Sequence, residues 1–338
     1  MKNFNKLSAA MLMLCCVFAC KKSQIETPAP VEPDYYTVQF GWDGDILEVT
    51  EEPLVKGNST NDLFGIQVYS TPNKEDNTGT SVKWTPFAYG LFDHGDDLTV
   101  NLLKGYKYKF VATMIVDGKE KLNGYYSSPF YISNKGSASI STQFDYQSSQ
   151  YFNGLGNGST YISKDGKTYD VPRTERFYGE YLEYIPGLKN NEKVMIKMKR
   201  ASFGAKFIAK GKLAKEGQLE IQITGAPKIM IDLSGTNKQH SDIYTFKNVK
   251  AAAEKETYTE THNVTINWHK PDGTIFPLGT HAITYKRNKT TTVNIEIETS
   301  AINNGIGLEI EDTEMTPDDE ETTIKDGEIV ETEIDTNA

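Results

Sequence analysis

The chain has 338 residues and a formal net charge of −10. Its three cysteines, Cys15, Cys16 and Cys20, all stand near its beginning, which excludes a disulfide framework, a cysteine nucleophile or a thiolate metal site in the rest of the chain. An acidic chain without a basic cluster also gives no support for nucleic-acid binding.

Residues 1–19 predict a bacterial export leader, with a lysine-bearing start followed by a small, apolar run over residues 7–19. This run is too short for a transmembrane helix, which needs ~20 residues. Because the run ends directly before Cys20, the segment resembles a lipoprotein signal, in which Cys20 becomes the acylated first residue. The alternative is an ordinary signal peptide with an incidental cysteine.

Residues 20–34 contain three prolines and few apolar side chains, which predicts a tether. Beyond it, short apolar segments alternate with glycine and asparagine turns, so we expect a first antiparallel β-sandwich over residues 35–147. Asp117-Gly118 predicts a hairpin between two of its strands. The expected strands are 36–40, 46–49, 64–69, 82–91, 98–102, 106–116, 121–132 and 140–146.

Residues 148–160 are small, polar and glycine-rich, which predicts a linker. We expect a second antiparallel β-sandwich over residues 161–310, so that the fold class is all-β with two sandwich domains in tandem. Alternation of apolar and polar residues marks strands there, with residues 249–256 the single short helical candidate. The alternating segments are 194–198, 219–223, 264–268 and 293–298.

Residues 311–338 form an acidic C-terminal tail with twelve acidic residues and one lysine, a formal charge of −11. The body that precedes this tail is therefore nearly neutral. Such a tail can simply be solvated. It also contains a period-two pattern, with Val330, Thr332 and Ile334 on one face and acidic residues on the other.

Motifs for catalysis or for a cofactor are missing from the sequence, which has neither a Gly-x-Ser-x-Gly elbow nor a His-Glu-x-x-His motif. His262 and His269 are seven residues apart on one expected strand, so they point to opposite faces and cannot hold one metal. Asp43-Gly44-Asp45 and residues 318–321 are candidates for weak calcium binding but lack an EF-hand pattern. We expect no enzyme and no cofactor, with a hydrolase of unmarked carboxylates as a minor alternative.

Similar short strand-like sequence patterns recur along the chain, at 64–69, 87–92, 105–110, 176–180, 194–201 and 304–309. Examples are FGIQVY, FAYGLF and GYKYKF. Together they resemble the fimbrillin-like lipoproteins of the Bacteroides and Porphyromonas group. The resemblance implies transthyretin-like β-sandwich domains, a lipid anchor in the outer membrane, surface display, and a role in fimbriae or cell adhesion.

In that family, removal of an N-terminal strand opens a groove that a strand of the next subunit fills by β-augmentation. The resemblance implies cleavage after a basic residue, and Lys56 is the only one between the tether and residue 60. It also makes Val330, Thr332 and Ile334 the candidate donor strand. The implied partners are other fimbrial subunits or a second copy of the chain.

One departure from the family pattern leaves an alternative open. The family usually cleaves after arginine, whereas the first arginine here is Arg173. An uncut chain would stay anchored as a base or accessory subunit.

A second alternative is a stand-alone outer-membrane lipoprotein that binds a glycan or another ligand. Tyr125, Tyr126, Phe130 and Tyr131 lie close together in the sequence, and exposed aromatic rings can stack on sugars. Aromatic residues are equally common in strands, where they pack against neighbours.

Overall fold

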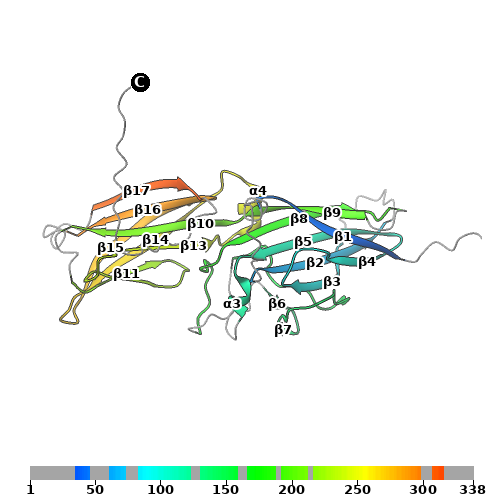
Figure 1. Ribbon diagram of the computed structural model, residues 1–338, viewed down its shortest axis with the longest axis horizontal. Coiled ribbons are helices and arrows are strands. Elements are labelled where there is room, and N and C mark those ends of the chain that lie inside the picture. The colour runs from blue at the N-terminus through cyan, green and yellow to red at the C-terminus, as the bar shows by residue number, and fades with distance from the viewer. Residues whose placement is uncertain are drawn as a thin grey trace, which may run out of the picture. The chain divides into compact units, whose positions relative to one another are not determined.

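A computed structural model describes residues 35–45, 61–73, 83–122, 130–158, 166–187, 192–211, 216–297 and 307–315. These residues are mostly β-strand (Figure 1), which confirms the predicted all-β class. Two short helices stand among the strands, α3 (Gly118–Leu122) and α4 (Val249–Glu254).

Seven strands hydrogen-bond in the order β3-β2-β5-β8-β9-β1-β4. Two pairs of neighbours in this sheet, β5 with β8 and β9 with β1, are far apart in the sequence, because β8 and β9 follow a long connection after β5 and β1 begins the described chain. The strands are β1 (Tyr35–Gly44), β2 (Leu63–Pro72), β3 (Thr85–Phe92), β4 (Thr99–Leu103), β5 (Tyr106–Ile115), β8 (Arg176–Tyr184) and β9 (Glu192–Arg200).

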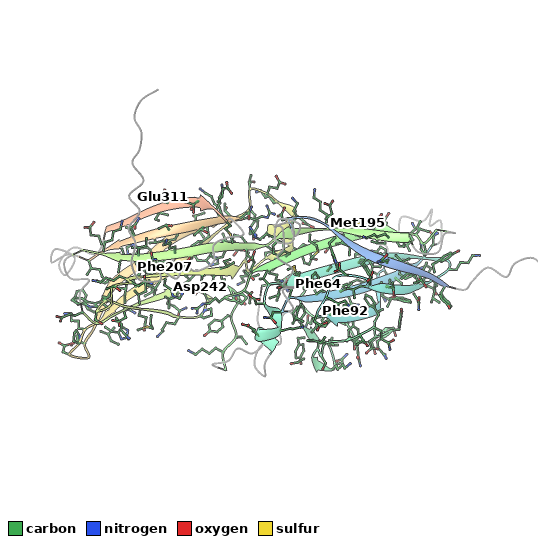
Figure 2. The ribbon with its side chains drawn as sticks, viewed as in Figure 1. Phe64, Phe92, Met195, Phe207, Asp242 and Glu311 are labelled. Atoms are coloured by element: carbon green, nitrogen blue, oxygen red, sulfur yellow. The ribbon has the colours of Figure 1, made fainter. Side chains whose placement is uncertain are left out.

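This sheet folds over itself at the contact between β8 and β9, which share only two register pairs, Phe177 with Arg200 and Tyr178 with Lys199. Side chains from β4, β1 and β9 share one buried cluster with side chains from β3, β2, β5 and β8. The rings of Phe40 in β1 and Phe110 in β5 lie 5.3 Å apart in it. The seven strands therefore enclose a sandwich core; Phe64 and Phe92, labelled in Figure 2, belong to it.

The other face of β2 and β5 is covered by the segment that carries β6 (Tyr131–Ile132) and β7 (Gly136–Ser137). Phe130 lies against Gly65 so closely that a Cβ at Gly65 would come within 2.6 Å of its ring. The buried Gln67 side chain accepts a 2.9 Å hydrogen bond from the backbone N–H of Phe152. As a result β2 is buried on both faces rather than on alternate residues.

Two four-stranded sheets form the second sandwich, in the orders β13-β10-β16-β17 and β12-β11-β14-β15. Their inward side chains meet in a common core, in which the rings of Phe203 and Tyr285 lie 4.4 Å apart. Phe207 of this core is labelled in Figure 2. The strands are β10 (Ser202–Lys210), β11 (Gln218–Ile223), β12 (Ile229–Asp232), β13 (Gln239–Thr245), β14 (Thr259–His269), β15 (Ile275–Lys286), β16 (Lys289–Glu296) and β17 (Gly307–Glu314).

The alternation predicted for the second half is confirmed: Val293, Ile295 and Ile297 are all buried. The helical candidate at residues 249–256 is confirmed as α4, whose N-cap residue Asn248 accepts a hydrogen bond from the Ala251 N–H.

The hairpin predicted at Asp117-Gly118 is wrong. β5 pairs with β2 on one side and with β8 on the other, so neither edge is left for the segment that follows it. Asp117 adopts a left-handed conformation with φ 51° and leads into α3 instead.

The boundary between the two sandwiches lies further along the chain than the sequence suggested. We expected residues 161–310 to form the second sandwich, whereas β8 and β9 complete the first one, and the second begins with β10 at Ser202. At the other end, β17 extends four residues beyond the expected boundary at 310 and pairs with β16 along its whole length. Period-two patterns identify a strand but do not say which strand it pairs with.

Candidate functional site

The N-terminal strand β1 occupies an interior position in the first sheet. It runs antiparallel to β4 and parallel to β9, and Val38 is in register with Val100 on one side and Glu192 on the other. Figure 1 shows β1 (blue) lying along β9 (green), although the two are far apart in the sequence. We call the space between β4 and β9 that β1 fills the strand slot.

Three alternate side chains of β1 point into the core. Tyr36, Val38 and Phe40 are 4%, 1% and 2% exposed. The Phe40 ring also lies 5.7 Å from that of Phe144. Burying a side chain of this size is worth ~1.5–3 kcal/mol, so the core depends on a strand being present in the slot.

The outward residues of β1 make polar contacts along β4 and the turn before it. Thr37 donates a hydrogen bond to Asn101 (2.9 Å), and Gln39 donates one to Asp97 (3.1 Å). These contacts are exposed, so they contribute less than the inward side chains.

Asp45, the residue after β1, enters a charged junction between the two sandwiches. Its carboxylate accepts hydrogen bonds from the Lys199 ammonium (3.0 Å) and from the backbone N–H of Arg200 (3.0 Å). It also pairs with the guanidinium of Arg287, which lies between β15 and β16. Asp45, Lys199, Arg200 and Arg287 are called the junction cluster below. Nothing in the sequence could have indicated it, since its members lie in three distant segments.

The protonation of Asp45 follows from these contacts. Burial alone would raise its pKa, but the hydrogen bonds from Arg200 and Lys199 and the positive charge of Arg287 outweigh burial and lower the pKa below its ordinary value. Asp45 is therefore a carboxylate at neutral pH.

This arrangement does not favour the weak calcium site considered for Asp43-Gly44-Asp45. The Asp45 carboxylate already faces two side-chain cations, and the Asp43 carboxylate accepts the N–H of Gly44 at 2.7 Å. A third cation at Asp45 would be repelled. Within the described residues, no group of three or more His, Cys, Asp or Glu side chains is placed to hold a metal ion.

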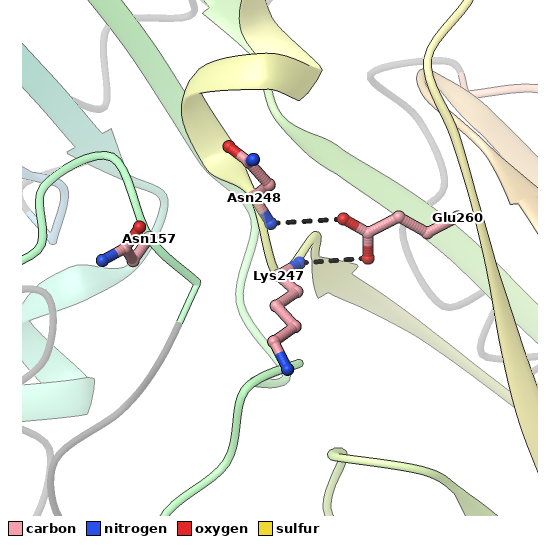
Figure 3. A pocket seen from close by; sticks show the side chains of 4 residues that line it. All are labelled: Asn157, Lys247, Asn248 and Glu260. Carbon is pink, nitrogen blue, oxygen red and sulfur yellow. Dashed lines mark hydrogen bonds between the residues drawn. The ribbon is translucent and has the colours of Figure 1, made fainter.

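A separate hollow of ≈ 410 Å³ is lined by Asn157, Lys247, Asn248 and Glu260 (Figure 3). Its carboxylate is already engaged, because Glu260 accepts the backbone N–H groups of Lys247 and Asn248, both at 3.2 Å, and the hydroxyl of Tyr258 at 2.7 Å. These bonds hold the loop before α4. We do not assign a ligand to this hollow.

The two histidines of β14 lie in different surroundings. His262 stacks on the core residue Phe203, at a ring distance of 6.1 Å, whereas His269 lies 3.1 Å from Glu220. They share no site, as their odd spacing predicted.

Of the four aromatic residues considered for sugar stacking, the structure describes Phe130 and the half-buried Tyr131 of β6. Phe130 is 2% exposed and packs into the core. Tyr125 and Tyr126 lie outside the described residues.

The site residues predicted from the sequence also lie outside the described residues: Cys20, Lys56, Val330, Thr332 and Ile334, together with the acidic segment 318–321. Lys56 belongs to the connection 46–60 between β1 and β2. Among the helices of the described part of the chain, none is long and apolar enough to cross a membrane.

No family model and no curated protein matches the chain. Among solved structures it is similar to the tip fimbrial protein Mfa3 of Porphyromonas gingivalis, with 10% identity, a TM-score of 0.34, and coverage of 83% of this chain and 100% of that one. The fimbrial anchor protein Mfa2 of the same organism gives 11% identity, a TM-score of 0.37, and coverage of 83% and 97%.

A protein of proposed cell adhesion function from Bacteroides eggerthii gives 10% identity, a TM-score of 0.38, and coverage of 85% and 97%. These are the kinds of protein that the sequence patterns resemble. With TM-scores below 0.5, they are loose likenesses and give no residue correspondence.

Proposed function

We propose that this chain is a surface-displayed fimbrial or adhesion subunit that assembles by β-strand exchange, with β1 as the strand that leaves. The observation that carries the proposal is the position of β1, an N-terminal strand buried between β4 and β9. The two sandwiches are taken as transthyretin-like, following the family resemblance of the sequence.

The place of β1 in the chain makes it suitable for exchange. It precedes every other described strand, and its neighbours β4 and β9 belong to later parts of the chain. A cut in the connection 46–60, with Lys56 as the candidate, separates β1 from the rest without dividing any described strand. The remaining sheet keeps two facing edges with unpaired backbone groups.

An empty slot would be unstable, which drives its refilling. Loss of β1 exposes the core that Tyr36, Val38 and Phe40 now cover, and it leaves the N–H and C=O groups of β4 and β9 without partners. A strand from another subunit can satisfy both needs, which is the physical basis of β-augmentation.

The candidate donor residues have the spacing that the slot requires. Val330, Thr332 and Ile334 recur at every second position, as do Tyr36, Val38 and Phe40. In the matching register Glu333 takes the place of Gln39, whose neighbour on β9 is Lys193. Opposite charges on neighbouring strands stabilise their pairing.

Before cleavage, the chain is held at the outer membrane by acylated Cys20, after removal of the leader 1–19 and through the tether 20–34. A chain that keeps β1 stays on this anchor as a base or accessory subunit. A chain cut after Lys56 is released from it and joins a fibre.

A reversible lock on β1 tests the proposal. The mature chain carries only Cys20, so an engineered pair at Thr37 and Asn101, which are in register across β1 and β4, can form a disulfide without competition from other thiols of the fold. The variant Thr37→Cys/Asn101→Cys is expressed on cells, and ladders of assembled subunits are followed on mildly heated gels. We expect ladders after reduction and monomers under oxidising conditions.

The matched control is Thr261→Cys/Thr284→Cys, across β14 and β15, where the two threonine hydroxyls lie 2.8 Å apart. Its ladders should be the same in both redox states. Ladders of the oxidised Thr37→Cys/Asn101→Cys protein would show that assembly does not need β1 to leave.

A further inference from the structure

We propose that the junction cluster is a carboxylate-recognition site at the end of the strand slot, and that it selects an incoming strand of another subunit that carries an acidic side chain at the position of Asp45. This inference rests on the proposed strand exchange and adds a chemical requirement for the partner. In the register proposed above, Asp335 of the tail takes the place of Gly41 and does not reach the junction cluster, so the cluster favours a strand from a different kind of subunit over the tail of a second copy. Asp45 lies five positions beyond Phe40, the last of the three inward residues.

The carboxylate receptor consists of two cations and one backbone donor. Lys199 Nζ and the Arg200 N–H each lie 3.0 Å from an oxygen of Asp45, and Arg287 pairs with the same carboxylate. Arg200 and Arg287 are almost completely buried. When β1 leaves the slot, Asp45 leaves with it and these donors lose their shared acceptor.

Other contacts hold the receptor in place without Asp45. Arg287 Nε donates to the Arg200 carbonyl oxygen at 2.7 Å, and the backbone N–H of Arg287 donates to the Tyr258 carbonyl. The Arg200 guanidinium lies 2.9 Å from Glu175 and donates to Asn288. The site is therefore preorganised for the next carboxylate, which reduces the entropy cost of binding it.

The neighbouring acids do not neutralise the receptor. Glu175 is matched by Arg200, and Glu256, which lies 3.5 Å from Lys199, has a side chain 79% exposed to water. Arg287 has no second carboxylate among the ion pairs of the described residues. A buried guanidinium without a counter-charge is costly, so a strand that brings a carboxylate is favoured over one that does not.

The junction also links the slot to the second sandwich. Lys199 and Arg200 end β9, whereas Arg287 lies between β15 and β16. A strand with the required acid therefore contacts both sandwiches, and a strand without it fills only the first.

The test uses the full chain with a specific protease site placed in the connection 46–60. After cleavage, β1 remains bound through non-covalent contacts, and a fluorescent peptide with the sequence of residues 35–46 competes for the slot. Native mass spectrometry identifies the exchanged complex, and fluorescence anisotropy gives its Kd. The same peptide with Asp45→Asn is compared with one carrying Asp43→Asn, whose exposed carboxylate accepts the Gly44 N–H and lies in register with the exposed Lys197 of β9. An exposed pair of this kind contributes little to binding.

We expect the Asp45→Asn peptide to bind about tenfold more weakly or worse, and the Asp43→Asn peptide to bind within about twofold of the parent. In the chain variant Lys199→Met, whose side chain is partly exposed, the difference in Kd between the parent peptide and the Asp45→Asn peptide should shrink. The equivalent Arg287→Met variant is a second measurement if its fold is retained.

Equal binding of the Asp45→Asn and parent peptides would overturn the carboxylate requirement and leave strand exchange intact. Failure of every peptide to enter the slot would overturn strand exchange itself, and the requirement with it.

Discussion

The side-chain oxygen of Gln67 in β2 lies 2.9 Å from the backbone nitrogen of Phe152 and accepts its hydrogen bond. The amide nitrogen of the same Gln67 donates to the carbonyl of Ala88 at 3.0 Å. One buried polar side chain thus joins residues 130–152, called the covering segment below, to the sheet and bridges β2 to β3.

Gln67→Leu should lower the free energy of unfolding by about 1–3 kcal/mol, because it leaves the Phe152 N–H without its acceptor. Urea denaturation measures the change. Gln218→Leu, at the exposed start of β11, is the matched control and should change stability by about 0.5 kcal/mol or less. Equal effects of the two substitutions would mean that the Gln67 bonds do not stabilise the fold.

Arg176→Met should loosen residues 153–158, which follow the covering segment. Arg176 is 1% exposed, donates to Thr113 at 2.8 Å, and reaches the carbonyls of Leu155 and Asn157. Loss of these charge-assisted bonds should cost about 3 kcal/mol and speed amide exchange near Asn157.

The control for this prediction is Arg173→Met. Arg173 pairs with Asp242 at 2.7 Å but its side chain is 37% exposed, so we expect a loss below about 1 kcal/mol. Exchange near Asn157 that stays unchanged in Arg176→Met would contradict the role given to Arg176.

Asp45→Asn should destabilise the uncut chain by about 2–4 kcal/mol at pH 7, because Lys199 and Arg287 lose their counter-charge. The folded-state pKa of Asp45 is lowered, so its contribution to stability is present above the ordinary value of 3.8 and is lost as the pH falls below it. Between pH 7 and pH 3, the difference in urea midpoint between the two proteins should therefore decrease as the pH falls below 3.8. A constant difference over this range would show that the Asp45 charge is not the cause.

Two truncations of the acidic tail, one longer than the other, should have different effects on stability. Removal of residues 316–338 should leave the urea midpoint unchanged and abolish ladder assembly, since it takes Val330, Thr332 and Ile334 but no described strand. Removal of 311–338 should also destabilise the monomer, because it cuts β17 and removes Asp312, which pairs with Lys286 and accepts from Thr291 at 2.8 Å. If the protein that lacks residues 316–338 still forms ladders of assembled subunits, the tail is excluded as the donor strand.

The sequence was informative about local structure. Alternation at 219–223 and 293–298 identified strands and their buried faces, because period-two spacing follows directly from strand geometry. The short helix at 249–256 was likewise identified from its local sequence pattern. A strand buried on both faces, such as β2, gives no such alternation, and Gln67 alone did not reveal that residues 130–152 cover the sheet.

Pairing over long distances was not predictable from these patterns. β8 and β9 were expected in the second sandwich, but they complete the first one. β1 pairs with β9, although most of the first domain's sequence separates the two strands. Asp45 was considered only as a calcium ligand, since neither Lys199 nor Arg287 is near it in the chain. Such contacts are set by tertiary packing, which period and propensity do not encode.

In the proposed assembly β1 leaves its subunit, and peptide mass spectrometry on assemblies purified from the cell surface can detect whether it has left. Peptides from residues 83–122 serve as the internal standard. We expect an N-terminus at Gly57 and no peptide from residues 35–45. Peptides from residues 35–45 in equimolar amount with the standard would contradict it.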